Sequence, residues 1–175
     1  MRRWAAALLL LALLAGAAYF FLLREKTVVA KVSSPQPAAT IGSGSEAVVV
    51  SSTGKVVPWL PPPKEPPLPT LPLTEEPKSG QLAGTALQQA RVLGAAPAPL
   101  RPYLERSYYG KSGVDVVLTT GIELRFGDAS RAALKWQAAA TVLADPSVTS
   151  LDYVDLHAPN HPSFAGSGHS LPPAP

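Results

Sequence analysis

Two runs of alternating apolar and polar residues lie in the last third of the chain. Val114, Val116 and Leu118 alternate with their neighbours, and the residues from Ile122 to Phe126 repeat the pattern. The polar sequence Thr119-Thr120-Gly121 lies between the two runs. A period of two on both sides of a turn predicts a β-hairpin.

The apolar spacing changes to three and four residues after this hairpin. It predicts a helix from Ala129 to Ala144, with Trp136 on the apolar face and Asp128 capping the first turn. Asp145-Pro146 ends the helix, because the residue before a proline is pushed out of the α region. The stretch from Leu151 to Leu156 returns to a strand. A ββαβ unit is therefore predicted, with a helix on one face of its sheet.

Shorter patterns precede this unit, and their strands could extend its sheet. The sequence thus predicts an α+β fold, a small curved antiparallel sheet with two helices on one face. The additional segments are a helix at Gly84–Gly94 and strands at Val28–Val32, Ala38–Ile41, Ala47–Val50 and Lys55–Val57.

Two further segments are predicted to lack regular structure. Residues 58–80 contain nine prolines, so neither a helix nor a strand ladder can persist there. We interpret them as an extended loop; the alternative is a polyproline docking site for an aromatic groove. The tail, residues 165–175, has little apolar content and is predicted to be disordered.

An apolar run without a charge extends from Trp4 to Leu23. Its twenty residues would span about 30 Å as a helix, the thickness of a bilayer core. This predicts a membrane anchor after a stub of residues 1–3, with residues 24–164 forming an extracytoplasmic domain of a single-pass type II protein. The alternative is a signal peptide cleaved after Ala17, which would release a secreted or periplasmic binding module.

The composition argues against several functions. A net charge of +3 without a basic cluster makes nucleic acid an unlikely partner, and the absence of cysteine excludes disulfides and thiolate metal sites. His157 and His161 are separated by Pro159, so they do not form a helical ligand pair. Asp152 and Asp155 are three apart in a strand and face opposite sides. No catalytic, cofactor-binding or metal-binding residue is predicted, and the chain is not expected to be an enzyme.

Three features together resemble a known family: the single anchor, the sequence G-I-E-L-R-F-G from Gly121 to Gly127, and L-D-Y-V-D-L-H from Leu151 to His157. A helix with a basic residue at Lys135 lies between the two motifs. With these features the chain resembles the FtsQ (DivIB) cell division proteins. The segments Val28–Ile41 and Ala47–Val57 resemble the family's entry strand and hairpin more weakly.

The resemblance implies a non-catalytic membrane scaffold of the bacterial divisome that binds FtsB-like and FtsL-like partners and regulates septal peptidoglycan synthesis. Strand addition is the implied mechanism, at an edge near the C-terminal strand that Pro159 and Pro162 would shorten. The family's POTRA domain has no room between Leu23 and Val28, since a domain needs at least about fifty residues. A degenerate relative without division function is therefore an alternative. The predicted partner-binding residues are Tyr153, Asp155, Leu156, His157, Ala158 and Asn160.

Overall fold

The computed structural model describes residues 36–73 and 76–173, which belong to one compact unit, Ser34–Pro175. The predicted strand Val28–Val32 and the predicted anchor Trp4–Leu23 lie outside the described residues. Among the residues that are described, none of the helices has the length and apolarity that a membrane span requires.

The first part of the unit is a three-stranded antiparallel sheet, which contains the predicted hairpin. Its strands are β1 (Pro37–Ile41), β2 (Val48–Ser51) and β3 (Val56–Val57), in that order, with a short 3-10 turn η1 (Gly44–Glu46) after β1. The expectation that these strands would extend the C-terminal sheet is wrong. They form a sheet of their own, because both of its outer edges are covered by other parts of the chain.

The proline-rich segment covers the β1 edge. Thr40 N donates to Pro69 O at 3.0 Å, and Leu71 N donates to Thr40 O at 2.8 Å, while the Leu71 side chain is buried. On the β3 side, Val56 N donates to Gly80 O at 2.8 Å. The described residues of 58–80 contain no helix or strand, as predicted, and the segment blocks strand pairing at these two edges.

Helix α2 (Gly84–Gly94) has the predicted bounds and buries Ala86, Ala90 and Leu93. It packs against β1 and β2 as well as β4 and β5, so it joins the two sheets through one core. A 3-10 helix, η2 (Ala98–Tyr103), follows it and leads into the second sheet.

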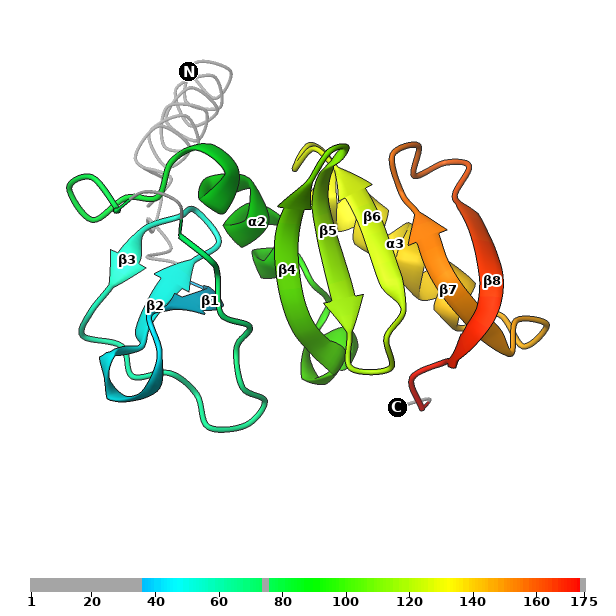
Figure 1. The fold of residues 1–175 in the computed structure, drawn as a ribbon, viewed down its shortest axis with the longest axis horizontal. Coiled ribbons are helices and arrows are strands. Elements are labelled where there is room, and N and C mark those ends of the chain that lie inside the picture. The colour runs from blue at the N-terminus through cyan, green and yellow to red at the C-terminus, as the bar shows by residue number, and fades with distance from the viewer. Residues whose placement is uncertain (1–35, 74–75, 174–175) are drawn as a thin grey trace, which may run out of the picture. The chain divides into compact units, whose positions relative to one another are not determined.

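The second sheet has five strands in chain order, side by side in Figure 1. Three of the four neighbouring pairs of strands are antiparallel, but β6 and β7 pair in parallel. The prediction of a wholly antiparallel sheet is therefore wrong, because the helix between these strands carries the chain back to the end where β6 began. The strands are β4 (Leu104–Gly110), β5 (Gly113–Leu118), β6 (Glu123–Gly127), β7 (Ser150–Asp155) and β8 (Ser163–Ser170).

Helix α3 (Ala132–Leu143) lies behind this sheet in Figure 1 and carries the predicted apolar anchor. Trp136 is 1% exposed and its ring centroid lies 4.8 Å from that of Phe126 on β6. The predicted cap is wrong. Asp128 Oδ1 accepts from Ser130 N at 3.1 Å, and the helix begins only after Arg131, whose φ is 51°.

Strand β8 corrects two predictions. The tail from Ala165 is not disordered, because its backbone pairs with β7 from Ser163 to Ser170. For the same reason β7 is not the free edge of the sheet. Pro159 and Pro162 do not shorten the edge, since both lie in the β7–β8 connection, where no ladder donor is needed.

Candidate functional site

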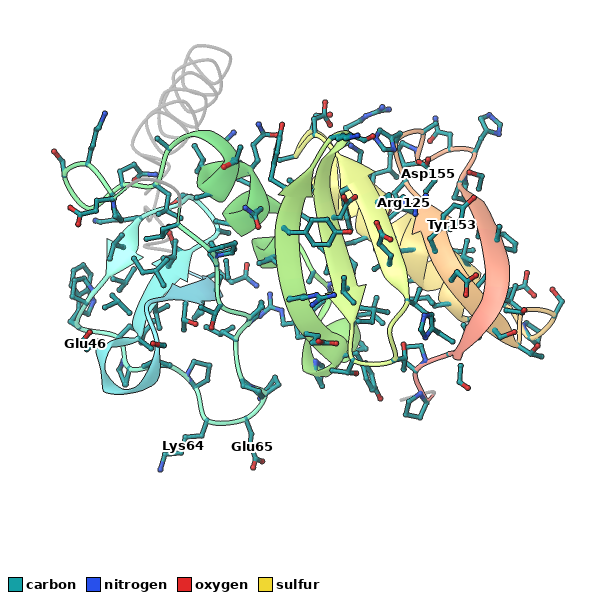
Figure 2. The ribbon with its side chains drawn as sticks, viewed as in Figure 1. Glu46, Lys64, Glu65, Arg125, Tyr153 and Asp155 are labelled. Atoms are coloured by element: carbon teal, nitrogen blue, oxygen red, sulfur yellow. The ribbon has the colours of Figure 1, made fainter. Side chains whose placement is uncertain are left out.

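The face of the five-stranded sheet that α3 does not cover is lined by two rows of side chains. In the first row Tyr108, Asp115, Arg125, Asp155 and Ser163 are successive cross-strand partners from β4 to β8. The second row runs through Arg106, Val117, Glu123, Tyr153 and Ala165. Figure 2 shows Arg125, Tyr153 and Asp155 close together on this face. Both rows end on the small side chains of β8.

A polar network fixes the middle of this face. Arg125 Nε and Nη2 donate to the two carboxylate oxygens of Glu123 at 3.2 and 3.3 Å, and Tyr108 Oη donates to Glu123 Oε1 at 2.9 Å. The guanidinium carbon of Arg125 lies 4.0 Å from the centre of the Tyr153 ring. The Arg125 guanidinium therefore makes a bidentate ion pair with Glu123 and a cation–π contact with Tyr153.

The network shifts the pKa values of its members in different directions, raising those of Tyr108 and Asp115 and lowering that of Glu123. Burial, followed by the hydrogen bond to Glu123, raises the pKa of Tyr108 to about 12. The hydrogen bonds from Arg125 hold the pKa of Glu123 below its ordinary value. Burial between the strands raises the pKa of Asp115, with the negative charge of Glu123 adding to the effect. At neutral pH, Glu123 and Arg125 thus form a stable charged pair.

Asp155 and His157 form a second pair, near the end of β7. Asp155 Oδ1 accepts from His157 N at 2.9 Å and lies 2.7 Å from His157 Nδ1. His157 Nε2 lies 3.3 Å from Ser112 O, so both ring nitrogens face an acceptor, and the hydrogen bond to Asp155 raises the pKa of His157. Partial burial opposes ionisation of Asp155, but the hydrogen bonds from His157 outweigh it and lower its pKa.

The outer edge of β8 exposes backbone groups that no other described strand pairs with. Leu156 N donates to Arg125 O on β6, so by alternation Tyr153 and Asp155 direct their backbone groups to β8. Their partners are Ala165 and Ser163, and the residue between them, Phe164, lies opposite Val154. The N–H and C=O of Phe164 therefore point away from the sheet. Its side chain is 46% exposed.

A bulge shapes the second half of β8. The pairing register shifts between Leu151 and Tyr153, and Gly166 has a φ of 97°. Asp152 Oδ1 accepts from Gly168 N at 2.7 Å, and a Cβ at Gly166 or Gly168 would clash with the Asp152 carboxylate. The positive φ at Gly166 favours glycine there, and the bulge confines the straight part of the edge to the residues around Phe164.

The C-terminal end of β8 is held by other parts of the unit. The His169 ring lies against Gly121 in the β5–β6 turn, and Leu171 packs on the core. Tyr103 Oη donates to Pro173 O at 3.2 Å. The residues after β8 also line an apolar groove of about 430 Å³ beside the end of α3. These contacts explain how a strand with few apolar side chains keeps its place.

The structure separates the predicted partner-binding residues into three groups. Tyr153 and Asp155 are on the open face, one strand from the β8 edge (Figure 2), whereas the His157 ring lies beside Ser112 O and Gly127. Leu156 is 0% exposed in the core, so its side chain cannot contact a partner. Ala158 and Asn160 are exposed in the β7–β8 connection, in which His161 N donates to Ala158 O at 2.9 Å.

Sequence reasoning missed Ser163 and Phe164, which carry the edge itself. Phe164 is the one Phe, Tyr or Trp after Tyr153, in a tail that is otherwise mostly polar or small, and that contrast was the available signal. Among the described residues, no group of three or more His, Cys, Asp or Glu side chains is placed to hold a metal ion. What the geometry provides is a strand edge, where a partner's backbone can pair.

An exposed strand edge on a small α+β unit is the arrangement of an interaction domain that binds by backbone pairing. Comparison with known families makes the assignment specific. Residues 39–157 match the family model described as cell division protein FtsQ/DivIB, C-terminal, which covers more than half of the chain. The chain therefore belongs to the FtsQ/DivIB family. No individual curated protein matches the chain.

This membership confirms the family resemblance and supports a role in cell division. The family is a non-catalytic division scaffold family that acts through divisome protein–protein interactions, which agrees with the expectation that the chain is not an enzyme. The matched residues end at His157, so β8 lies beyond them.

Proposed function

We propose that this protein is a bitopic, non-catalytic scaffold of the bacterial divisome that binds FtsB-like and FtsL-like partners by strand addition to β8. Through these partners it regulates septal peptidoglycan synthesis. The observation that carries the proposal is the β8 edge in a chain of the FtsQ/DivIB family: eight exposed or half-exposed residues without a charged side chain or a proline. Such an edge is open to pairing with another chain.

The other sheet edges support this choice by contrast. The proline-rich segment lies on β1 and residues 78–82 lie on β3. The β4 edge carries the exposed charged residues Glu105 and Arg106 and packs against α2. Charges and covering segments prevent strand addition. Among the described strands, β8 alone combines a long exposed edge with neither kind of protection.

We expect Phe164→Pro to abolish or strongly weaken binding of the FtsB-like protein encoded in the same genome. Proline removes the outward N–H of Phe164 and so deletes a donor to the added strand, while the β7–β8 ladder does not use that donor. Binding is measured by pull-down and by titration with purified proteins, and circular dichroism checks the fold.

Phe164→Ala is the matched control, because it removes the same side chain and keeps the N–H. A loss of binding in the proline variant that exceeds the loss in the alanine variant isolates backbone pairing. Equal binding by both variants, or no binding by the unsubstituted chain, would remove β8 from the interface. An FtsL-like partner is tested in the same way.

Membrane anchoring is the second part of the proposal and rests on the apolar run Trp4–Leu23 together with the family, which suggests a membrane-anchored divisome protein. We expect the full-length chain to stay in the membrane pellet after carbonate extraction, with its C-terminal part accessible to protease from outside the cytoplasm. A soluble species whose N-terminus lies near Ala18 would instead support the secreted binding module.

A further inference from the structure

The charges around β8 indicate what kind of strand it binds. After Lys135 the sequence contains no Lys or Arg, but it contains three aspartates, Asp145, Asp152 and Asp155. The β7–β8 ribbon is therefore acidic within a chain whose net charge is +3. Two of these aspartates, Asp152 and Asp155, lie on β7, one strand away from the open edge.

The nearest arginine of the sheet forms no ion pair with Asp155, whose ion pair is with His157. Arg125 is its cross-strand partner on β6, yet the guanidinium forms its ion pair with Glu123 and lies over Tyr153. Asp155 accepts both of its hydrogen bonds from His157 through Oδ1, and Oδ2 has no hydrogen-bond partner among the described residues. The side chain of Asp155 is 37% exposed. A partner's cation could thus bind Oδ2 without displacing a hydrogen bond among the described residues.

The register of β8 determines which position of an added strand would face this oxygen. Ser163 lies opposite Asp155, and its side chain is small and exposed. Neighbouring strands are about 4.8 Å apart, so a residue added opposite Ser163 lies about 10 Å from Asp155. The flexible four-carbon stem of a lysine can extend across a serine over most of that distance.

The adjacent position has a different environment. A residue paired with Phe164 would place its side chain on the face that carries α3, beside the half-exposed Phe164 ring. An apolar side chain there would remove apolar surface from water on both strands. The next position, opposite Ala165, would return to the open face near Tyr153.

We propose that β8 binds a basic strand: a Lys or Arg opposite Ser163 pairs with Asp155, and the following residue is apolar and packs on Phe164. This inference rests on the proposed function, because it assumes strand addition at β8. A second copy of the chain is disfavoured as the occupant, since its own β8 brings the same carboxylates to the interface. Like charges in close opposition repel the wrong partner.

The test compares Asp155→Asn with the unsubstituted full-length chain in lipid nanodiscs, with the extracytoplasmic segment of the FtsB-like protein as the probe. Asparagine keeps an oxygen that can accept from His157 but removes the charge. We expect binding to weaken roughly three- to fivefold at low salt, with the difference disappearing near 1 M NaCl. Glu105→Gln is the matched control: it removes one exposed carboxylate at the opposite edge strand and should change neither affinity nor salt dependence.

A charge exchange locates the contact. Each Lys or Arg of the probe is changed to Glu, one at a time, and each variant is titrated against Asp155→Lys. We expect this variant to restore binding to one of the charge-reversed probes. If Asp155→Asn binds the probe as tightly as the unsubstituted chain does, the inference is overturned, while strand addition at β8 still holds. A homodimer that Phe164→Pro dissociates would also overturn the inference. Failure of the unsubstituted chain to bind would overturn both proposals.

Discussion

Trp136→Ala is expected to lower the free energy of unfolding by about 3–5 kcal/mol, the usual cost of removing a large buried aromatic side chain. Trp136 is 1% exposed, stacks at a tilt on Phe126 and donates from Nε1 to Val92 O at 2.7 Å. It thus connects α3 to both β6 and α2. Such a loss is a large fraction of the total stability of a small domain, so partial unfolding at 37 °C is expected.

Two variants separate the contributions to this effect. Trp59→Ala is the matched control, because Trp59 is 70% exposed and its loss should change stability by less than about 0.5 kcal/mol. Trp136→Phe keeps an aromatic ring but loses the donor to Val92 O, and should cost about 1–2 kcal/mol. Urea unfolding followed by circular dichroism measures all three. A Trp136→Ala variant as stable as Trp59→Ala would show that α3 is not packed through this residue.

The elements that the sequence predicted well are those whose apolar side chains pack into the core. The apolar residues of β5, β6 and α3 recur at the periods of their structures because each buries one stripe in a common core. Helix α2 was predicted with its observed bounds for the same reason. The direction of β7 was not predictable from these periods, since a buried strand shows the same pattern in parallel and antiparallel pairs. The connection through α3 contained the missing information.

Strand β8 was missed because its stability does not come from its own apolar side chains. Its backbone pairs with β7, and its glycines fit beneath Asp152, as described above. Its C-terminal end is pinned by His169, Leu171 and Pro173, whose partners lie far away in the sequence. A local pattern rich in Gly and Ser is read as disorder, although tertiary contacts can override it. The binding edge was thus predicted at β7, whereas the edge strand of the sheet is β8.

The second large effect concerns Lys135, a charged residue that is 2% exposed. Its ammonium donates to Phe126 O at 2.7 Å, to Asp128 O at 2.9 Å and to Asp128 Oδ1 at 2.8 Å. It therefore ties the end of β6 to the start of α3. Lys135→Met keeps the apolar stem but leaves the Phe126 carbonyl without this donor. We expect a loss of about 1–3 kcal/mol, the cost of a buried acceptor that loses its partner.

Asp128 gives an independent readout of the same contact. Hydrogen bonds from Lys135, then from Ser130, lower the pKa of Asp128 from 3.8 to about 2. A carboxyl group whose folded pKa is lowered contributes stability above its unfolded pKa, and that contribution is lost as the pH falls from about 4 through about 2. In Lys135→Met the pKa of Asp128 should rise towards 3.8, so the stability lost in this pH window should shrink. NMR titration of the Asp128 carboxyl group follows the shift directly.

Lys111→Met, in the exposed β4–β5 turn, is the control and should change neither the pKa of Asp128 nor the stability lost in this pH window. An unchanged pKa of Asp128 in Lys135→Met would mean that the lysine does not hold this carboxylate.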